Sequence, residues 1–251
     1  MYKINNKSIF RRLRELGIKT KEYKNCNENI FDVIDTEEKA YWLGFLYADG
    51  CVSTKGNSIQ INISTKDIEH LEKFKSFIGS TNKINIHRTH EFGSKKPQNF
   101  MCSLNVQNKH MHESLIKNGC VPRKSLILKF PDTQIFESDD LIRHFLRGYC
   151  DGDGSFGCYP RHRNQPFKQM NASLNLIGTK DFLYNVQTYL GKGCLIRKAN
   201  CCEKTFRLNY SGTRAEYAIN LMYSNSTISL QRKQLIYDEV IGPRYMSRTC
   251  K

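Results

Sequence analysis

The chain has 251 residues, enough to bury a substantial core and to form one large or two small domains. Its 39 lysines and arginines exceed its 24 aspartates and glutamates, which gives a formal net charge of +15. This charge favours nucleic acid over a membrane as partner, because the sequence contains no long apolar span. The 10 cysteines are scattered without the spacing of a zinc site, and the first residues are polar and basic. The sequence therefore predicts reduced thiols in an intracellular protein of the cytoplasm, nucleoid or organelle matrix that is not secreted.

Residues 1–35 form a basic extension ahead of the main part of the chain. Ser8 and Gly17 bound a short helical stripe, in which apolar residues recur at positions 9, 10, 13 and 16. The stripe fits either the second helix of a partial helix-turn-helix or a basic amphipathic helix packed on the main body. In both cases its basic side chains are suited to phosphate contacts.

A helix that ends in Asp-Gly opens the next part of the chain. Asp35, with Glu38 three residues later, predicts its start, and Gly50 directly after Asp49 predicts its end. Residues four apart share one face of a helix. On this helix such positions hold small residues, namely Ala40, Gly44 and Ala48. The face therefore forms a groove that lets another backbone approach closely.

Strands and helices alternate over the rest of this first half, residues 36–130. Residues 58–64 alternate apolar and polar side chains, which predicts a half-buried strand. A helix is predicted over 66–77, strands over 83–88 and 99–107, and a helix over 109–118 that Gly119 ends.

The same pattern recurs in residues 131–251, which comprise the end of a linker over 121–140 and the second half. A helix that starts near Ser138 again ends in Asp-Gly, at Asp153, and carries small residues four apart at Gly148 and Gly152. Asp153 follows Asp49 by 104 residues (153 − 49), and Asn209 follows Asn105 by the same 104 (209 − 105). These matched offsets indicate a duplicated unit.

The second copy differs from the first in a longer, more basic segment after its motif and in an apparent extra residue near Gly178. Aligning Thr65-Lys66-Asp67 with Thr179-Lys180-Asp181 inverts the alternation of the preceding strand, which predicts a one-residue bulge near Gly178. Two apolar-faced helices, over 213–223 and 229–240, finish the chain, and Gly242-Pro243 is expected to end the second.

The duplication predicts an α+β fold of two pseudo-symmetric αββαββα halves. Each half is a saddle-shaped, four-stranded antiparallel sheet covered by helices, and the two small-residue helices pack at the centre. Asp49 and Asp153 then lie side by side. Two carboxylates about 5 Å apart at an effective dielectric near 20 repel by roughly 3 kcal/mol, so either one stays protonated or a cation lies between them. Oxygen ligands alone favour a hard ion such as Mg²⁺. The alternative is that both are ordinary helix ends in solvent.

Both helix ends resemble the signature of the LAGLIDADG homing endonucleases in their single-chain form with two motifs. The stretches are YWLGFLYADG (41–50) and FLRGYCDGDG (145–154). The family's glycine falls on Gly44 and Gly148, and its closing Asp-Gly on 49–50 and 153–154. The sequence departs from the signature at Trp42 for the first Leu, Arg147 for the Ala, and Tyr47 for the first Asp. The resemblance covers about residues 36–240.

The resemblance implies a site-specific, double-strand DNA endonuclease that acts as a monomer and hydrolyses one phosphodiester in each strand of a long target. It implies Mg²⁺ as cofactor, with Ca²⁺ or Mn²⁺ able to substitute in the site. Asp49 and Asp153 would hold the metal, with the backbone carbonyls of Ala48 and Gly152 as further ligands. A basic catalytic residue is expected near each metal. The candidates are Lys66 and Lys180, which recur in the two halves, although a Thr-Lys-Asp helix start explains them equally well.

Polar residues on the outward strand faces predict a surface for double-stranded DNA, because Asn and Gln pair with adenine and Arg with guanine in the major groove. The candidates for base contacts are Gln60, Asn62, Asn105, Gln107, Arg207 and Asn209. Cations of the loops are better suited to phosphates. These are Arg88, Lys95, Lys96, Arg161, Arg163 and Lys168. Singly, each is an ordinary surface residue, and only the set argues for a binding face.

Two other functions fit parts of the sequence. The first is a non-cleaving nucleic-acid binder on the same fold, either an RNA maturase that assists intron splicing or a DNA-binding regulator. Descendants of this kind often lose one acid, whereas this chain keeps both. The second is an interaction protein whose small-residue helices pair with a partner, which matches neither the net charge nor the polar strand faces.

Overall fold

The computed structural model describes residues 12, 15, 16, 26–54, 56–88, 100–160, 170–197 and 205–249. Most of the helix predicted between Ser8 and Gly17 lies outside the described residues. So do five of the predicted phosphate contacts: Lys95, Lys96, Arg161, Arg163 and Lys168.

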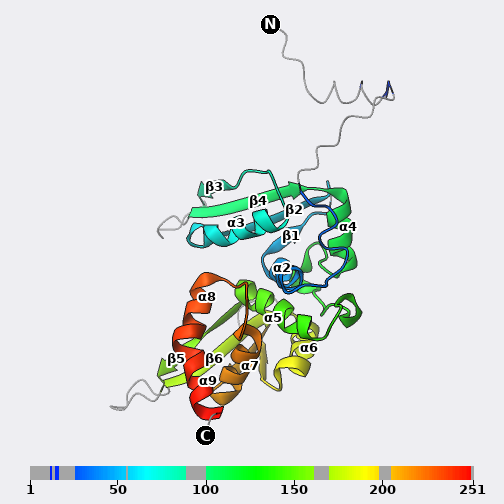
Figure 1. Cartoon of the computed structure of the whole chain (residues 1–251). Coiled ribbons are helices and arrows are strands. Elements are labelled where there is room, and N and C mark those ends of the chain that lie inside the picture. Colours follow the sequence, from blue (N-terminus) through cyan, green and yellow to red (C-terminus); the bar gives the residue numbers. More distant parts are fainter. Residues whose placement is uncertain are drawn as a thin grey trace, which may run out of the picture.

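Two similar halves lie one above the other in Figure 1, with helices α2 and α5 between them. The first half comprises α2 (Glu37–Ala48), β1 (Gly50–Val52), β2 (Ser58–Ser64), a 3₁₀ turn (Thr65–Asp67), α3 (Ile68–Phe77), β3 (Asn85–Arg88), β4 (Phe100–Gln107) and α4 (Lys109–Lys117). Its strands form an antiparallel sheet in the order β1-β2-β4-β3. The alternation in β2 has the predicted effect, because Ile59, Ile61 and Ile63 are buried in the core beneath the sheet.

The second half follows after two short 3₁₀ turns, Lys124–Leu126 and Thr133–Ile135. It comprises α5 (Asp140–Asp153), β5 (Gly154–Pro160), β6 (Met170–Gly178), α6 (Lys180–Leu190), β7 (Cys194–Arg197), β8 (Phe206–Ser211) and α7 (Thr213–Tyr223). Its antiparallel sheet has the order β5-β6-β8-β7, which repeats that of the first. The predicted α+β fold of two αββαββα halves is thus confirmed.

Strand register corrects the predicted alignment of the two halves. In the first sheet Ile61 pairs with Gly50 on one side and with Leu104 on the other. In the second sheet Leu176 pairs in the same way with Gly154 and Leu208, so Ile61 and Leu176 are counterparts. Counting on from these two residues makes Ser64 the counterpart of Thr179, and each side chain caps the helical segment that follows it. The pairing of β6 is continuous on both sides, so the bulge predicted near Gly178 is wrong. Lys66 and Lys180, matched by their shared triplet, are therefore one position out of register.

Both ends of the repeat differ in detail from the prediction. Thr36, rather than Asp35, caps α2, because its hydroxyl accepts the Lys39 N–H at 3.3 Å while Asp35 pairs with the Lys39 ammonium at 2.8 Å. At the C-terminal end, the predicted stop at Gly242-Pro243 is wrong. Helix α8 (Gln231–Ile236) passes through a π-helical turn (Tyr237–Ile241) into α9 (Gly242–Thr249). The wider π turn offsets the hydrogen-bond ladder, which lets a proline without an N–H enter the next helix.

Residues 26–35, which the sequence analysis assigns to the extension, pack against the first half. Phe31 and Ile34 are fully buried, and the Phe31 carbonyl accepts a hydrogen bond from Asn118 Nδ2 at 2.7 Å. Ile34 also forms a parallel bridge to Phe136 near the start of the second half. This segment therefore contributes to the core that supports α2. No helix among the described residues is long and apolar enough to cross a membrane.

Candidate active site

Helices α2 and α5 cross with their backbones in contact, because glycines occupy the crossing. A Cβ atom on Gly44 would overlap the carbonyl oxygen of Phe145 and lie 2.8 Å from its carbonyl carbon. A Cβ on Gly148 would likewise overlap the carbonyl oxygen of Tyr41. Ala40, the remaining predicted interface residue toward the start of α2, is fully buried.

The two predicted acids lie at the adjacent C-terminal ends of these helices. Asp49 is the C-terminal cap of α2, and Asp153 is the last residue of α5. A Cβ on Gly152 would lie 3.2 Å from Asp49 Oδ2 and would overlap the Ala48 Cβ. The absence of a side chain at Gly152 thus lets the Asp49 carboxylate rest against α5.

The pKa of Asp49 reports how unfavourable this carboxylate is in the folded chain. Burial is the main cause that raises the pKa of Asp49 to about 6, and the negative charge of Asp153 raises it further. Three cations act in the opposite direction, Lys124, Lys233 and Arg232. The site therefore holds two interacting carboxylates with three positive charges nearby.

Two lysines that the sequence analysis did not select reach the ends of the motif helices. The ammonium of Lys124 donates to the carbonyl oxygen of Gly50. That of Lys233, which is 3% exposed, donates to the carbonyl oxygens of Cys150 at 2.5 Å, Asp151 at 2.9 Å and Gly154 at 2.8 Å. Because Gly50 and Gly154 correspond in the repeat, each acid has one lysine at an equivalent place.

Comparison with known proteins shows which fold the chain shares. Residues 36–101 match the family model described as a LAGLIDADG-like domain. The structure resembles that of the LAGLIDADG homing endonuclease I-GzeII in complex with its DNA target, with 12% identity and a TM-score of 0.54 over 84% of this chain and 92% of that chain. The chain therefore has the fold of the LAGLIDADG homing endonucleases.

Two further solved structures share this LAGLIDADG fold. The homing endonuclease I-LtrWI bound to target DNA matches at 11% identity with a TM-score of 0.52, over 90% of this chain and 92% of that chain. The meganuclease I-AabMI bound to uncleaved DNA matches at 14% identity with a TM-score of 0.51, over 84% and 91%. No curated protein matches the chain in sequence.

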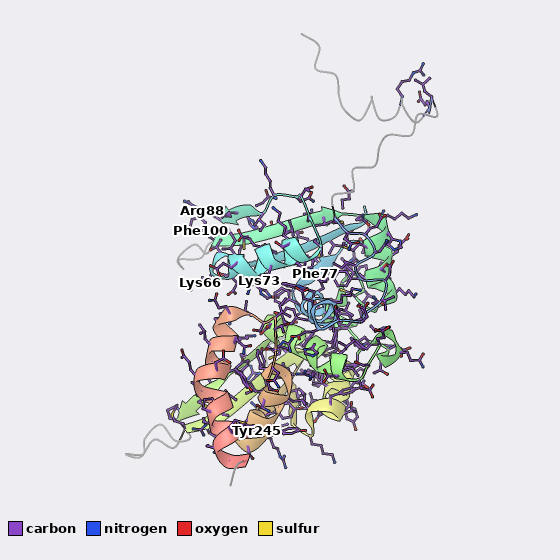
Figure 2. The ribbon with its side chains drawn as sticks, viewed as in Figure 1. Lys66, Lys73, Phe77, Arg88, Phe100 and Tyr245 are labelled. Atoms are coloured by element: carbon purple, nitrogen blue, oxygen red, sulfur yellow. The ribbon has the colours of Figure 1, made fainter. Side chains whose placement is uncertain are left out.

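Lys66 and Lys180 lie elsewhere in the LAGLIDADG fold. Both are exposed residues at the start of a helical segment, and Figure 2 shows Lys66 at the end of the sheet near Arg88 and Phe100. Neither is among the cations that shift the pKa of Asp49. Their catalytic role stays a prediction. Lys124 and Lys233 are 109 residues apart (233 − 124), so the 104-residue repeat does not reveal them.

Arg147 of α5, where the sequence departs from the family signature, has a structural explanation. This arginine is fully buried and donates to the carbonyl oxygens of Met222 and Ile228, both at 2.8 Å. It also binds Glu37 Oε1 at 2.6 Å, at the start of α2. Arg147 therefore ties the chain between α7 and α8 to both motif helices.

Polar side chains lie on the outward strand faces as predicted from the alternation. Asn62, Asn105, Gln107 and Arg207 are exposed, and Gln60 and Asn209 are half-buried. Gln60 faces Asn105 across the first sheet, and Asn175 faces Asn209 across the second, with Asn209 Nδ2 donating to Asn175 Oδ1 at 2.8 Å.

Asn175 was missed because the alignment of the two Thr-Lys-Asp triplets placed its strand one residue out of register. The predicted phosphate contact Arg88 lies over the Phe100 ring at 5.2 Å (Figure 2).

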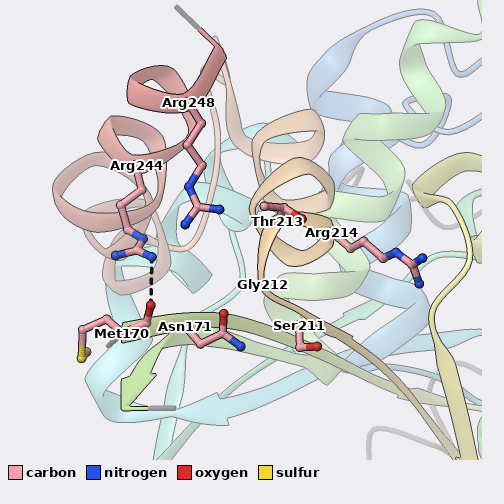
Figure 3. A pocket seen from close by; sticks show the side chains of 8 residues that line it. All are labelled: Met170, Asn171, Ser211, Gly212, Thr213, Arg214, Arg244 and Arg248. Carbon is pink, nitrogen blue, oxygen red and sulfur yellow. Dashed lines mark hydrogen bonds between the residues drawn. The ribbon is translucent and has the colours of Figure 1, made fainter. Parts of the chain in front are cut away.

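A basic pocket of about 590 Å³ lies apart from the acids, between α9, the start of α7 and the strand β6 (Figure 3). Arg244 and Arg248 line it and pair with the buried Glu216 at 3.1 and 3.4 Å. Arg244 also donates to the Met170 carbonyl oxygen at 3.0 Å. These bonds fasten α9 to α7 and β6.

The donor set at the two acids fits a hard divalent cation. The described residues contain no group of three or more His, Cys, Asp or Glu that could enclose a metal. Mg²⁺ usually takes only one or two carboxylates and fills its shell with water and substrate phosphate oxygens. Two adjacent carboxylates, one with a pKa raised by the other, are suited to such an ion.

Replacement of Asp49 by Asn should stabilise the metal-free protein at high pH. The pKa of Asp49 is about 6 in the folded chain, above the value near 3.9 of an unfolded chain, so proton binding favours folding. That stabilisation is complete below about pH 4 and is lost as the pH rises through 6. At pH 8 without divalent ions, Asp49→Asn should raise the free energy of unfolding by about 2–3 kcal/mol.

Denaturant unfolding at pH 4 and pH 8 would measure this difference. The control is Asp181→Asn, an exposed carboxylate in the first turn of α6, which should change stability by only a few tenths of a kcal/mol. Equal free energies of unfolding for wild type and Asp49→Asn at pH 8 would show that the ionised Asp49 carboxylate does not destabilise the fold.

Proposed function

We propose that the chain is a site-specific, double-strand DNA endonuclease that hydrolyses one phosphodiester in each strand with a divalent metal, Mg²⁺ in the first place. The observation that carries the proposal is the pairing of Asp49 with Asp153 where α2 and α5 end, each with a lysine at the same helix end. The DNA complexes of similarly folded proteins support it.

Asp49 and Asp153 would hold the cation, with the carbonyl oxygens of Ala48 and Gly152 as further ligands. When bound, a divalent ion lowers the pKa of water and stabilises charge on the phosphate and the leaving oxygen. The fold would preorganise these metal ligands, because it holds both carboxylates close together without the ion. Above pH 6 Asp49 is ionised even without metal, so the site carries the charge that a cation requires.

Lys124 and Lys233 take the role of basic catalytic residues in this proposal, in place of Lys66 and Lys180. Each ammonium is held by backbone carbonyls at the C-terminal end of a motif helix. A cation fixed there adds electrostatic stabilisation to a phosphate that becomes more negative in the transition state. The fixed geometry matters because no reorganisation is then needed during the reaction.

The outward strand faces would contact the DNA target on both sides of the acids. Gln60 and Asn105, and Asn175 and Asn209, form paired amide side chains that can read adenine in the major groove. The net charge of +15 suits a long phosphate backbone. With both motifs in one chain the protein would act as a monomer, in a compartment that contains DNA.

Cleavage of a randomised duplex library by the wild-type chain tests the proposal. In Mg²⁺ we expect one family of related sequences to be cut once in each strand, and the Asp49→Asn, Asp153→Asn double variant to cut none. The same library in Ca²⁺ measures binding. Sequence-specific binding without cleavage in Mg²⁺ or Mn²⁺ would contradict the endonuclease and favour a non-cleaving DNA regulator.

A further inference from the structure

The position two residues before each acid holds a different, buried side chain in the two halves. Tyr47 precedes Asp49 and Asp151 precedes Asp153, and the two are 104 residues apart (151 − 47), as the acids are. Tyr47 is fully buried and Asp151 is 1% exposed. We infer that both are positioning residues, each of which places the lysine of its own half. The inference rests on the proposed function, in which those lysines act on the two strands.

Asp151 holds the start of the helix that carries Lys233. Its Oδ2 accepts the backbone N–H of Leu230 at 2.7 Å, and Leu230 is the N-terminal cap of α8. Lys233 follows one turn later, with its N–H bonded to the Leu230 carbonyl at 2.9 Å. The Lys233 ammonium then returns to the main-chain carbonyl of Asp151 at 2.9 Å. One residue is therefore bonded to both ends of this turn.

Two tyrosines complete the support of the Asp151 carboxylate. Tyr41 from α2 donates to Oδ2 at 2.7 Å, and Tyr223 from α7 donates to Oδ1 at 2.6 Å. A buried carboxylate is costly unless several donors satisfy it. An apolar residue would fill the same volume without this cost, but it would leave the Leu230 N–H without its acceptor. The carboxylate thus serves the start of α8.

In the first half Tyr47 holds a helix end in the same way, but it donates a hydrogen bond where Asp151 accepts one. Its hydroxyl donates to the carbonyl oxygen of Asn118 at 2.7 Å, and Asn118 is the C-terminal cap of α4. The next residue, Gly119, has a φ of +88° and no room for a side chain, because a Cβ would overlap the Tyr47 hydroxyl. The chain turns here and reaches Lys124, whose ammonium meets Gly50.

The choice of residue follows from which helix end must be held. Helix C-termini leave carbonyls without partners inside the helix, and helix N-termini leave N–H groups without partners. Tyr47 meets the end of α4 and supplies a donor, whereas Asp151 meets the start of α8 and supplies an acceptor. The two motifs differ at this position because Lys124 follows the C-terminal end of α4, whereas Lys233 follows the N-terminal end of α8.

Strand-resolved cleavage of a duplex carrying a different label on each strand tests the inference. Tyr47→Phe removes only the hydroxyl, and Asp151→Ala removes the carboxylate. Each should slow cleavage of one strand by about 10²-fold, since displacing a catalytic group by about 1 Å costs that much. The affected strand should differ between the two variants, while DNA binding in Ca²⁺ stays within a few-fold. Equal slowing of both strands, or of neither, would overturn the inference.

Two variants separate positioning from general packing. Tyr223→Phe removes a hydroxyl from the same carboxylate without touching Leu230, so both strands should be cut at nearly the wild-type rate. Asp151→Asn keeps an oxygen for the Leu230 N–H and should restore cleavage of the strand that Asp151→Ala loses. Failure of Asn to restore it, or the strand bias of Asp151→Ala appearing in Tyr223→Phe, would contradict the role. If Asp151→Ala does not fold, Tyr47→Phe carries the test.

Amide hydrogen exchange of the free protein gives a readout that needs neither metal nor cleavage. Tyr47→Phe should speed exchange about tenfold in peptides spanning 118–126, and Asp151→Ala in peptides spanning 229–236, because each loses one buried hydrogen bond. Peptides from β7 should stay unchanged. If the wild-type chain cuts no DNA, the proposed function fails while this measurement still decides the positioning. Unchanged exchange in both segments would overturn it.

Discussion

Replacing either Asp49 or Asp153 by asparagine is expected to abolish double-strand cleavage, by at least about 10³-fold. A divalent ion supplies several kcal/mol of transition-state stabilisation, and each 1.36 kcal/mol is a tenfold change in rate. Asparagine keeps the shape of the side chain but loses the charge that attracts a hard cation. Burial and then the charge of Asp153 raise the pKa of Asp49, so the two acids are electrostatically linked and neutralising one changes the whole site.

Cleavage in Mg²⁺ and binding in Ca²⁺ would be measured side by side on the selected target. Binding should stay within a few-fold of wild type, because removing a negative charge beside the phosphate backbone does not weaken attraction to it. Asp181→Asn, on α6 and away from the acids, is the matched control and should cut normally. Undiminished cleavage by both single variants would reject the carboxylate pair as the catalytic site.

Leucine at Gly44 or Gly148 is expected to destabilise the fold by more than about 3 kcal/mol. Inserting bulk into a packed core usually costs about 1–3 kcal/mol, because side chains can shift. At these glycines the obstacle is the backbone carbonyl of the other helix, at Phe145 or Tyr41, which cannot move without separating α2 from α5. The acids at the ends of both helices would then lose their relative placement.

Denaturant unfolding followed by circular dichroism would measure the loss. Gly242→Ala is the control, because its added Cβ would lie 3.3 Å from the Tyr237 carbonyl oxygen, a tight contact that offsets the preference of a helix for alanine of about 1 kcal/mol, so the net change should be small. A Gly148→Leu protein that unfolds at the wild-type denaturant concentration would show that the helices do not need close contact at this crossing.

The sequence alone determined the architecture, the motif helices and the two acids. Those features are written in local patterns, because residues two apart share a strand face and residues four apart share a helix face. The alternation in 58–64 and the small residues in 40–48 thus predicted a sheet face and a helix groove that the structure shows. The 104-residue offset added the pseudo-symmetry without any knowledge of contacts.

Only the tertiary structure decided the register of the second half and the lysines beside the acids. Identical triplets suggested a match between Lys66 and Lys180, but register depends on pairing with neighbouring strands, and that pairing places them one position apart. Lys233 reaches the end of α5 only because α8 starts where Asp151 accepts its first N–H. Such contacts join segments about 80 residues apart, and no local period records which distant helix end a buried side chain will meet.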